Sequence, residues 1–242
     1  IEFQLEKGVI TLDKLLESKE EMKETTKQKI MLRLAKCMLL TSSQGIINCD
    51  LKPANMIITE SNQIQIIDWG IAEVDYSLKG SEPKSISKQT LWWRAPEILI
   101  KYANYSYKID VFSLGLIFIQ IFKKEENPYN YYYDDDYDSE SIDRMKDYLM
   151  YILKYDPANV LDIERYFKQF VDGESQQKRI YEIFLKRTKN EQFSDLISKM
   201  LELNPKHRCT YKDIILHPYF QTMKRDSIPY MKTFINNMPD IN

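Results

Sequence analysis

The longest stretch of helical hydrophobic spacing lies in the first quarter of the chain. Apolar side chains recur there every three to four residues. They predict a helix over residues 25–43 whose apolar face holds Ile30, Met31, Leu34, Ala35, Met38 and Leu39. Gly45 follows as a C-terminal cap residue. Residues 107–122 are apolar on nearly all sides, so this second predicted helix should be buried at the centre of the fold.

Short strands are predicted on either side of the first long helix. Residues 55–59 and 63–67 are rich in isoleucine and flank a polar turn. Residues 1–5 alternate like another strand, and Glu6-Lys7-Gly8 predicts a break before Thr11, which can cap a short helix. The β content of the fold should therefore be small.

The remaining chain is predicted to contain helices and two polar loops. Residues 72–89 carry glycine, proline and several serines, which is typical of a long surface loop. Residues 127–138 form an acidic, tyrosine-rich tract that we interpret as a solvated insertion. Further helices are expected near residues 141–153, 160–170, 175–187, 191–203 and 210–216. The fold class is therefore mainly α with a small β element.

Composition and charge exclude several kinds of protein. With 43% hydrophobic and 29% charged residues, the chain has an ordinary globular composition. A formal net charge of −2 gives no electrostatic case for binding nucleic acid or an anionic membrane. The apolar run Leu114–Phe122 is far shorter than the ~18–20 residues of a membrane helix. Sparse cysteines (Cys37, Cys49 and Cys209) favour a reducing compartment, and hence an intracellular, cytoplasmic or nuclear protein.

One short polar segment gathers the residue types that phosphoryl transfer from ATP requires. Asp50 could accept the proton of an attacking hydroxyl, Lys52 could offset phosphate charge, and Asn55 could bind Mg²⁺. Asp68, in Asp68-Trp69-Gly70 after the predicted strands, could bind the same ion between the phosphates. For each motif alone, the alternative of a simple turn stays open, because Asp and Asn commonly cap turns.

Two further acidic residues, Glu97 and Asp110, could have buried structural roles. Glu97 needs a cation if it is buried, and Arg208, far along the chain, is the candidate partner. Composition alone favours the alternative of two unrelated surface charges. Asp110 stands at the start of the apolar helix, where it can oppose the helix dipole and can also accept N–H groups of the Asp50 loop.

Together, these motifs resemble the C-terminal lobe of eukaryotic protein kinases in order and spacing. The similar segments are Asp50-Leu51-Lys52-Pro53-Ala54-Asn55, Asp68-Trp69-Gly70, Ala95-Pro96-Glu97, Asp110-Val111-Phe112-Ser113-Leu114-Gly115, Arg208 and His217-Pro218-Tyr219-Phe220. Lysine at position 52 implies Ser/Thr rather than Tyr specificity. The segment Thr90–Glu97 looks most like the branch that holds the cyclin-dependent, mitogen-activated and casein kinase type two enzymes.

The resemblance also implies cofactors and further site residues. ATP and Mg²⁺ would be the cofactors, with Asn55 and Asp68 as metal ligands. Ile57 would lie under the adenine ring. Thr90 would contact Asp50 and Lys52 near the acceptor site, and so joins them as a candidate catalytic residue. Ser77, Ser81, Ser85, Ser87 and Thr90 would lie in the activation segment.

The resemblance divides the chain into three parts. Residues 1–8 would be the end of the smaller N-lobe and the hinge, residues 9–220 the C-lobe, and residues 221–242 a C-terminal tail. No Gly-x-Gly-x-x-Gly run is present in these residues, so we expect a kinase fold without most of its N-lobe, in other words a fragment that would not catalyse efficiently alone.

Two residues depart from the kinase pattern. Asn48 stands where the pattern has His, and Asn can form hydrogen bonds but cannot fill the same volume. Cys49 stands where the pattern has an Arg that receives an activation-loop phosphate. Switching by phosphorylation through this position should therefore be lost. Cys49 could be sensitive to oxidation, but a small, semi-buried side chain is the simpler interpretation.

Three hypotheses follow. The first is a Ser/Thr protein kinase acting on a protein substrate, with its N-lobe outside these residues. The second is a pseudokinase that uses the lobe to bind a protein partner, which the substitutions and the tyrosine-rich tract would suit. The third, a metal-dependent hydrolase using Asp50 and Asp68, leaves the Ala95-Pro96-Glu97 and Arg208 matches unexplained. None of them requires nucleic acid or a membrane.

Overall fold

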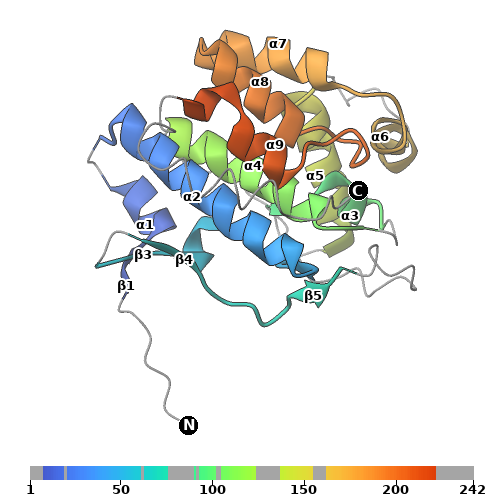
Figure 1. Cartoon of the computed structure of the whole chain (residues 1–242). Helices are drawn as coiled ribbons and strands as arrows, with labels where there is room; N and C mark the ends of the chain where they lie inside the picture. Colours follow the sequence, from blue (N-terminus) through green and yellow to red (C-terminus); the bar gives the residue numbers. More distant parts are fainter. Residues whose placement is uncertain are drawn as a thin grey trace.

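Helix α4 (Lys108–Lys123) forms the centre of the fold. Every side chain from Ile109 to Ile121 is buried, which confirms the prediction for this apolar segment. The helix packs against α2 (Glu24–Ser43) and α8 (Glu191–Met200) (Figure 1). At Gly115 a Cβ atom would lie 2.8 Å from the Leu201 side chain, so glycine permits close contact with the C-terminal end of α8.

The structure, a computed structural model, describes most of the chain. The described residues are 8–18, 21–60, 63–75, 90, 93–101, 105–123, 137–154 and 162–221. The strand predicted at residues 1–5, all but Gln221 of the predicted tail, and most of the two predicted polar loops lie outside these ranges. The assignment of residues 1–8 and 221–242 to a hinge and a tail therefore stays a prediction.

Helices make up most of the described residues and gather on one side of the small sheets (Figure 1). The other helices are α1 Leu12–Glu17, α3 Pro96–Leu99, α5 Tyr137–Tyr151, α6 Ile163–Val171, α7 Gln177–Thr188 and α9 Tyr211–Leu216. The helix predicted over residues 25–43 is confirmed as α2, and its apolar face is buried. After it, Gly45 adopts a left-handed φ of 70° and donates its N–H to Ser42 O.

Two small antiparallel sheets carry the strands. One has the order β1-β3-β4 (Gly8–Thr11, Met56–Thr59 and Ile64–Ile66), so the two predicted isoleucine strands are confirmed. The other pairs β2 (Ile46–Ile47) with β5 (Glu73–Val74). The segment predicted to hold the site therefore lies between β2 and β3.

Three local predictions were wrong. Gly8 does not end an element but begins β1, because its missing Cβ lets Ile57 of β3 approach; a Cβ there would lie 2.4 Å from Ile57 Cγ2. Strand β5 lies inside the segment predicted to be all loop, since it gains a partner in β2. Helix α5 begins at Tyr137, within the tract predicted to be a loop through residue 138. Thr11 does precede α1, but its hydroxyl makes no capping bond.

Candidate active site

The Asp50 carboxylate lies at the centre of a cluster of donors between β2 and β3. Its Oδ2 accepts hydrogen bonds from Lys52 Nζ at 2.8 Å and Asn55 Nδ2 at 2.9 Å. Its Oδ1 accepts the Thr90 hydroxyl at 2.5 Å. Asp50 is only 8% exposed. A buried carboxylate held by three donors, one of them cationic, is fixed in position.

Thr90 links the loop to a segment forty residues later. Its hydroxyl donates to Asp50 and accepts from Lys52 Nζ at 3.1 Å. The contact that the kinase resemblance implied for Thr90 is therefore present in the structure. A role for Thr90 in catalysis stays a prediction.

The backbone of the loop is held from below by the start of α4. Asp110 accepts Asn48 N–H at 2.6 Å and Cys49 N–H at 3.0 Å, which confirms its predicted role as an acceptor of N–H groups from the Asp50 loop. Asn48 Oδ1 in turn accepts Asp50 N–H at 3.0 Å. Burial raises the pKa of Asp110 to about 7, although the two backbone N–H groups oppose that rise by favouring the charged form.

Cys49 adopts an unusual backbone conformation within this loop. Its φ of 65° is left-handed, a region that costs a non-glycine residue roughly 1–2 kcal/mol. The side chain is 3% exposed, so it is more buried than predicted. Because Asp110 binds the Cys49 N–H, the contact with α4 helps to hold this conformation.

Asn55 and Asp68 flank the paired strands, Asn55 directly before β3 and Asp68 two residues after β4. Asn55 ends the short 3₁₀ helix Pro53–Asn55, and its carbonyl accepts the N–H of Ile67, the neighbour of Asp68. With its Nδ2 bound to Asp50, Asn55 retains its side-chain oxygen as a possible metal ligand. Asp68 is exposed with a φ of 58°, and no hydrogen bond joins it to Asp50 in the described part of the chain.

The side chains of Asn55 and Asp68 fit an open metal site, which other molecules help to complete, rather than one closed by protein ligands alone. No group of three His, Cys, Asp or Glu side chains that could hold a metal occurs among the described residues. Mg²⁺ in phosphoryl-transfer sites commonly takes one or two carboxylates and completes its shell with phosphate and water oxygens. The Asn55 oxygen and the Asp68 carboxylate are of the right chemistry for that arrangement.

Ile57 lies on β3, opposite the first strand. It pairs with Thr11 of β1 and Gln65 of β4, and is half-buried against Gly8. Its place at the point where the chain enters the described fold is compatible with the predicted position under an adenine ring. No contact in the structure tests that role.

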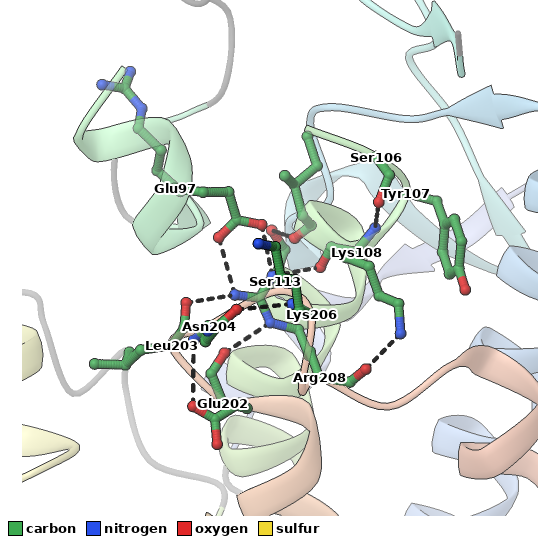
Figure 2. Close-up of polar contacts among 12 residues, drawn as sticks. Glu97, Ser106, Tyr107, Lys108, Ser113, Glu202, Leu203, Asn204, Lys206 and Arg208 are labelled. Carbon is green, nitrogen blue, oxygen red and sulfur yellow. Dashed lines mark hydrogen bonds and ion pairs between the residues drawn. The ribbon is translucent and has the colours of Figure 1, made fainter. Parts of the chain in front are cut away.

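Glu97 and Arg208 form a buried ion pair, so the alternative of two surface charges was wrong. Their side chains are 1% and 0% exposed and meet in a bidentate contact of 2.7 and 2.9 Å, as Figure 2 shows. Ser113 of α4 also donates its hydroxyl to Trp93 O at 2.6 Å. These contacts fix the segment around residues 93–97 to the helical core.

Sequence reasoning missed two acidic side chains on and just after β5. Glu73 Oε2 accepts the Tyr105 hydroxyl at 2.7 Å, and Asp75 Oδ2 accepts Tyr107 N–H at 3.0 Å. Two acids two residues apart, and two tyrosines two residues apart before α4, were the only signals for these contacts. That spacing puts both acids on one side of an extended segment.

No helix in the described ranges is long and apolar enough to cross a membrane.

Comparisons with known proteins support the same picture. A profile described as "Protein kinase domain" matches residues 3–220. The chain is 28% identical over 203 residues to the mitogen-activated protein kinase HOG1 of Wallemia muriae, covering 79% of this chain and 65% of that protein. It is 24% identical over 223 residues to extracellular signal-regulated kinase 1 of Dictyostelium discoideum, covering 88% of this chain and 39% of that protein.

The chain thus spans less than two thirds of the length of these relatives. The matches give no support to the pseudokinase alternative, and they agree with the fold and with the order of motifs in the sequence. The chain belongs to the protein kinase domain family, on the side of the Ser/Thr kinases that includes the mitogen-activated enzymes.

Proposed function

We propose that this chain is the larger lobe of an ATP-dependent Ser/Thr protein kinase, which transfers the γ-phosphoryl group of ATP to a protein hydroxyl. The observation that carries the proposal is the set of three donors on the Asp50 carboxylate. Lys52, Asn55 and Thr90 hold it in one orientation at the edge of the helical lobe. Phosphoryl transfer depends on such positioning more than on covalent chemistry.

The hydrogen bonds of Asp50 also indicate where the acceptor would bind. A carboxylate offers about four lone-pair positions. Both positions on Oδ2 are occupied, by Lys52 and Asn55, whereas Oδ1 accepts only the Thr90 hydroxyl among the donors of the described residues. The remaining position on Oδ1 can accept the O–H of a substrate Ser or Thr, so Asp50 would orient that hydroxyl and take its proton.

The other residues would manage charge. The Lys52 side chain is 26% exposed. Its Nζ binds both Asp50 and Thr90 and can also reach a transferring phosphate. Asn55 and Asp68 would hold Mg²⁺. When bound, the ion would offset the negative charge of the ATP phosphates. Ile57 would contact the adenine ring from the C-lobe side.

The partner would be a protein that presents a hydroxyl. We also propose an intracellular site of action, which the three thiols support, since Cys37, Cys49 and Cys209 form no disulfide. The names of the relatives describe mitogen-activated and extracellular signal-regulated kinases.

The test uses the full-length protein with Mg-ATP and a protein substrate. Asp50→Asn should lower phosphate transfer by at least about 100-fold, because it removes the proton acceptor, while ATP binding persists. Asp172→Asn, at the exposed C-cap position of α6, is the matched control and should leave the rate unchanged. Equal rates for Asp50→Asn and the wild-type protein would refute the assigned mechanism.

A second measurement separates nucleotide binding from catalysis. Mg-ATP should raise the melting temperature of the wild-type protein, since a ligand that binds only the folded state stabilises it. Asp68→Asn should reduce that rise. A rise of the same size in the Asp68→Asn variant would exclude Asp68 as a ligand of the Mg-ATP complex.

A further inference from the structure

Strand β5 is attached to the loop before α4 by two carboxylates. The Tyr105 hydroxyl donates to Glu73 Oε2 at 2.7 Å, and the Tyr107 N–H donates to Asp75 Oδ2 at 3.0 Å. The Asp75 N–H also donates to Gly45 O at 2.7 Å, at the end of α2. Asp75 is 2% exposed. The acids therefore connect β5 to two helices of the core rather than facing solvent as ordinary surface charges.

These contacts connect both sides of the loop of residues 48–55 that contains Asp50, which we call the catalytic loop. Glu73 pairs with Ile47 of β2, and the loop residues Asn48 and Cys49 follow directly. Their N–H groups are bound by Asp110, five residues after Tyr105. The loop is thus held on one side through β2 and β5, and on the other side directly by α4. The Tyr105–Glu73 hydrogen bond joins the two sides.

The same region is unsuited to binding a phosphate. Cys49 supplies no cation. Asp110 accepts its N–H, Glu73 pairs with Ile47 two residues earlier, and both acids act electrostatically on Tyr105. Burial, followed by the hydrogen bond to Glu73, raises the pKa of Tyr105 well above its ordinary value, so its hydroxyl remains a donor. Among the described residues, a phosphate added here would lie near these two carboxylates, and position 49 offers no Arg to bind it.

We propose that Tyr105 is a positioning residue for the catalytic loop. Through Glu73 it holds β5 and β2, and thereby the backbone of residues 48–50, in place without a phosphate on the activation segment. The effect on catalysis rests on the proposed kinase function. The effect on the loop backbone does not, because it follows from the contacts alone.

The experiment combines amide hydrogen exchange with kinetics on the full-length protein. Tyr105→Phe keeps the ring and removes only the hydroxyl. Amides of residues 47–50 and 73–75 should exchange roughly tenfold faster, as expected for the loss of one hydrogen bond to a charged group. Amides of α8 should not change. Tyr181→Phe, on α7, is the matched control and should alter neither region.

Kinetics and a conservative replacement distinguish positioning from general stability. With Tyr105→Phe, kcat should fall by a similar factor while the KM for ATP is unchanged, since the nucleotide contacts lie elsewhere. Glu73→Gln retains an acceptor for the Tyr105 hydroxyl and should restore most of the exchange protection that Glu73→Leu loses. Phosphatase treatment of the wild-type protein should leave exchange at residues 47–50 unchanged.

Three results would overturn the proposal. Unchanged exchange at residues 47–50 in Tyr105→Phe would show that the hydrogen bond does not hold the loop. Equally faster exchange in α8 would show a loss of global stability instead. Loosening of the loop by phosphatase, to the extent seen with Tyr105→Phe, would show that a phosphate does the positioning. A wild-type protein without kinase activity would refute the proposed function, while the exchange data would still decide the role of Tyr105.

Discussion

Replacing Arg208 by Met should be among the most damaging single changes in this lobe. All five guanidinium N–H groups of Arg208 donate: two to the Glu97 carboxylate, and one each to the carbonyls of Lys108, Glu202 and Leu203. Removing the guanidinium leaves a buried carboxylate without its cation and three carbonyls without this donor. Breaking a buried pair from one side typically costs about 3–5 kcal/mol.

That loss would be about a fifth or more of the stability of a typical domain, which is about 5–15 kcal/mol. The free energy of unfolding is measured by urea denaturation of the protein carrying Arg208→Met. Arg165→Met removes an exposed arginine from α6 and is the matched control, with an expected change within about 0.5 kcal/mol. The double variant Arg208→Met with Glu97→Leu removes both charges.

The double variant tests the physical reason for the loss. If the cost comes from an unpaired buried charge, removing Glu97 as well should recover part of it, so the two single losses should exceed the combined loss. A loss below about 1 kcal/mol for Arg208→Met would refute the reasoning, because the pair would then add nothing beyond what packing supplies. A double variant that loses the full sum would show that the two side chains act independently.

Three further changes test other parts of the lobe. Thr90→Val should lower kcat about tenfold by removing the hydroxyl bound to Asp50, whereas Thr90→Ser should not. Because the folded-state pKa of Asp110 is raised from 3.8 to about 7, its carboxyl makes stability fall as pH rises through that window. Asp110→Asn should remove that part of the slope, measured as unfolding free energies at pH 5 and pH 7. Gly8→Ala should cost about 1–3 kcal/mol by overpacking against Ile57, and Ile57→Ala in the same chain should relieve part of it. If Ile57→Ala relieves the overpacking, the double variant shifts the unfolding midpoint by less than the sum of the two single shifts. Additive damage gives the full sum.

Hydrophobic spacing was sufficient to predict the helices other than the four-residue α3, because each of them buries apolar side chains of its own. Helices α2 and α4 agree with the prediction to within a residue or so at either end. The two-residue strands β2 and β5 carry no such pattern, since a strand this short is defined by its partner. Gly8 was assigned to a break because glycine weakens strands, yet here it provides the space that Ile57 occupies.

In the candidate site, too, residues close in sequence were predictable from their spacing, whereas contacts between distant residues were not. Asp50, Lys52 and Asn55 lie within six residues of one another, so their sequence spacing alone suggested a common site. The contacts of Thr90 with Asp50, and of Arg208 with Glu97, span 40 and 111 residues. Residue chemistry says that a buried Glu97 needs a cation, and it named Arg208 only as a candidate. The contact of Thr90 with Asp50 was implied only by the resemblance to the kinase lobe.

The two departures from the kinase pattern, Asn48 and Cys49, leave the hydrogen bonds of the Asp50 carboxylate in place. Asp110 holds the loop through the N–H groups of Asn48 and Cys49, which a residue of almost any type supplies. Asn48 still orders Asp50 by accepting its N–H, although the Asn48 Nδ2 is buried without a hydrogen-bond partner in the described structure, at a cost of about 1–3 kcal/mol. The chain thus accepts a local loss of stability at Asn48 while the donors around Asp50 stay in place. Cys49 supplies no cation for the phosphate that the kinase pattern binds at this position, and the Tyr105–Glu73 hydrogen bond is a connection that needs no phosphate.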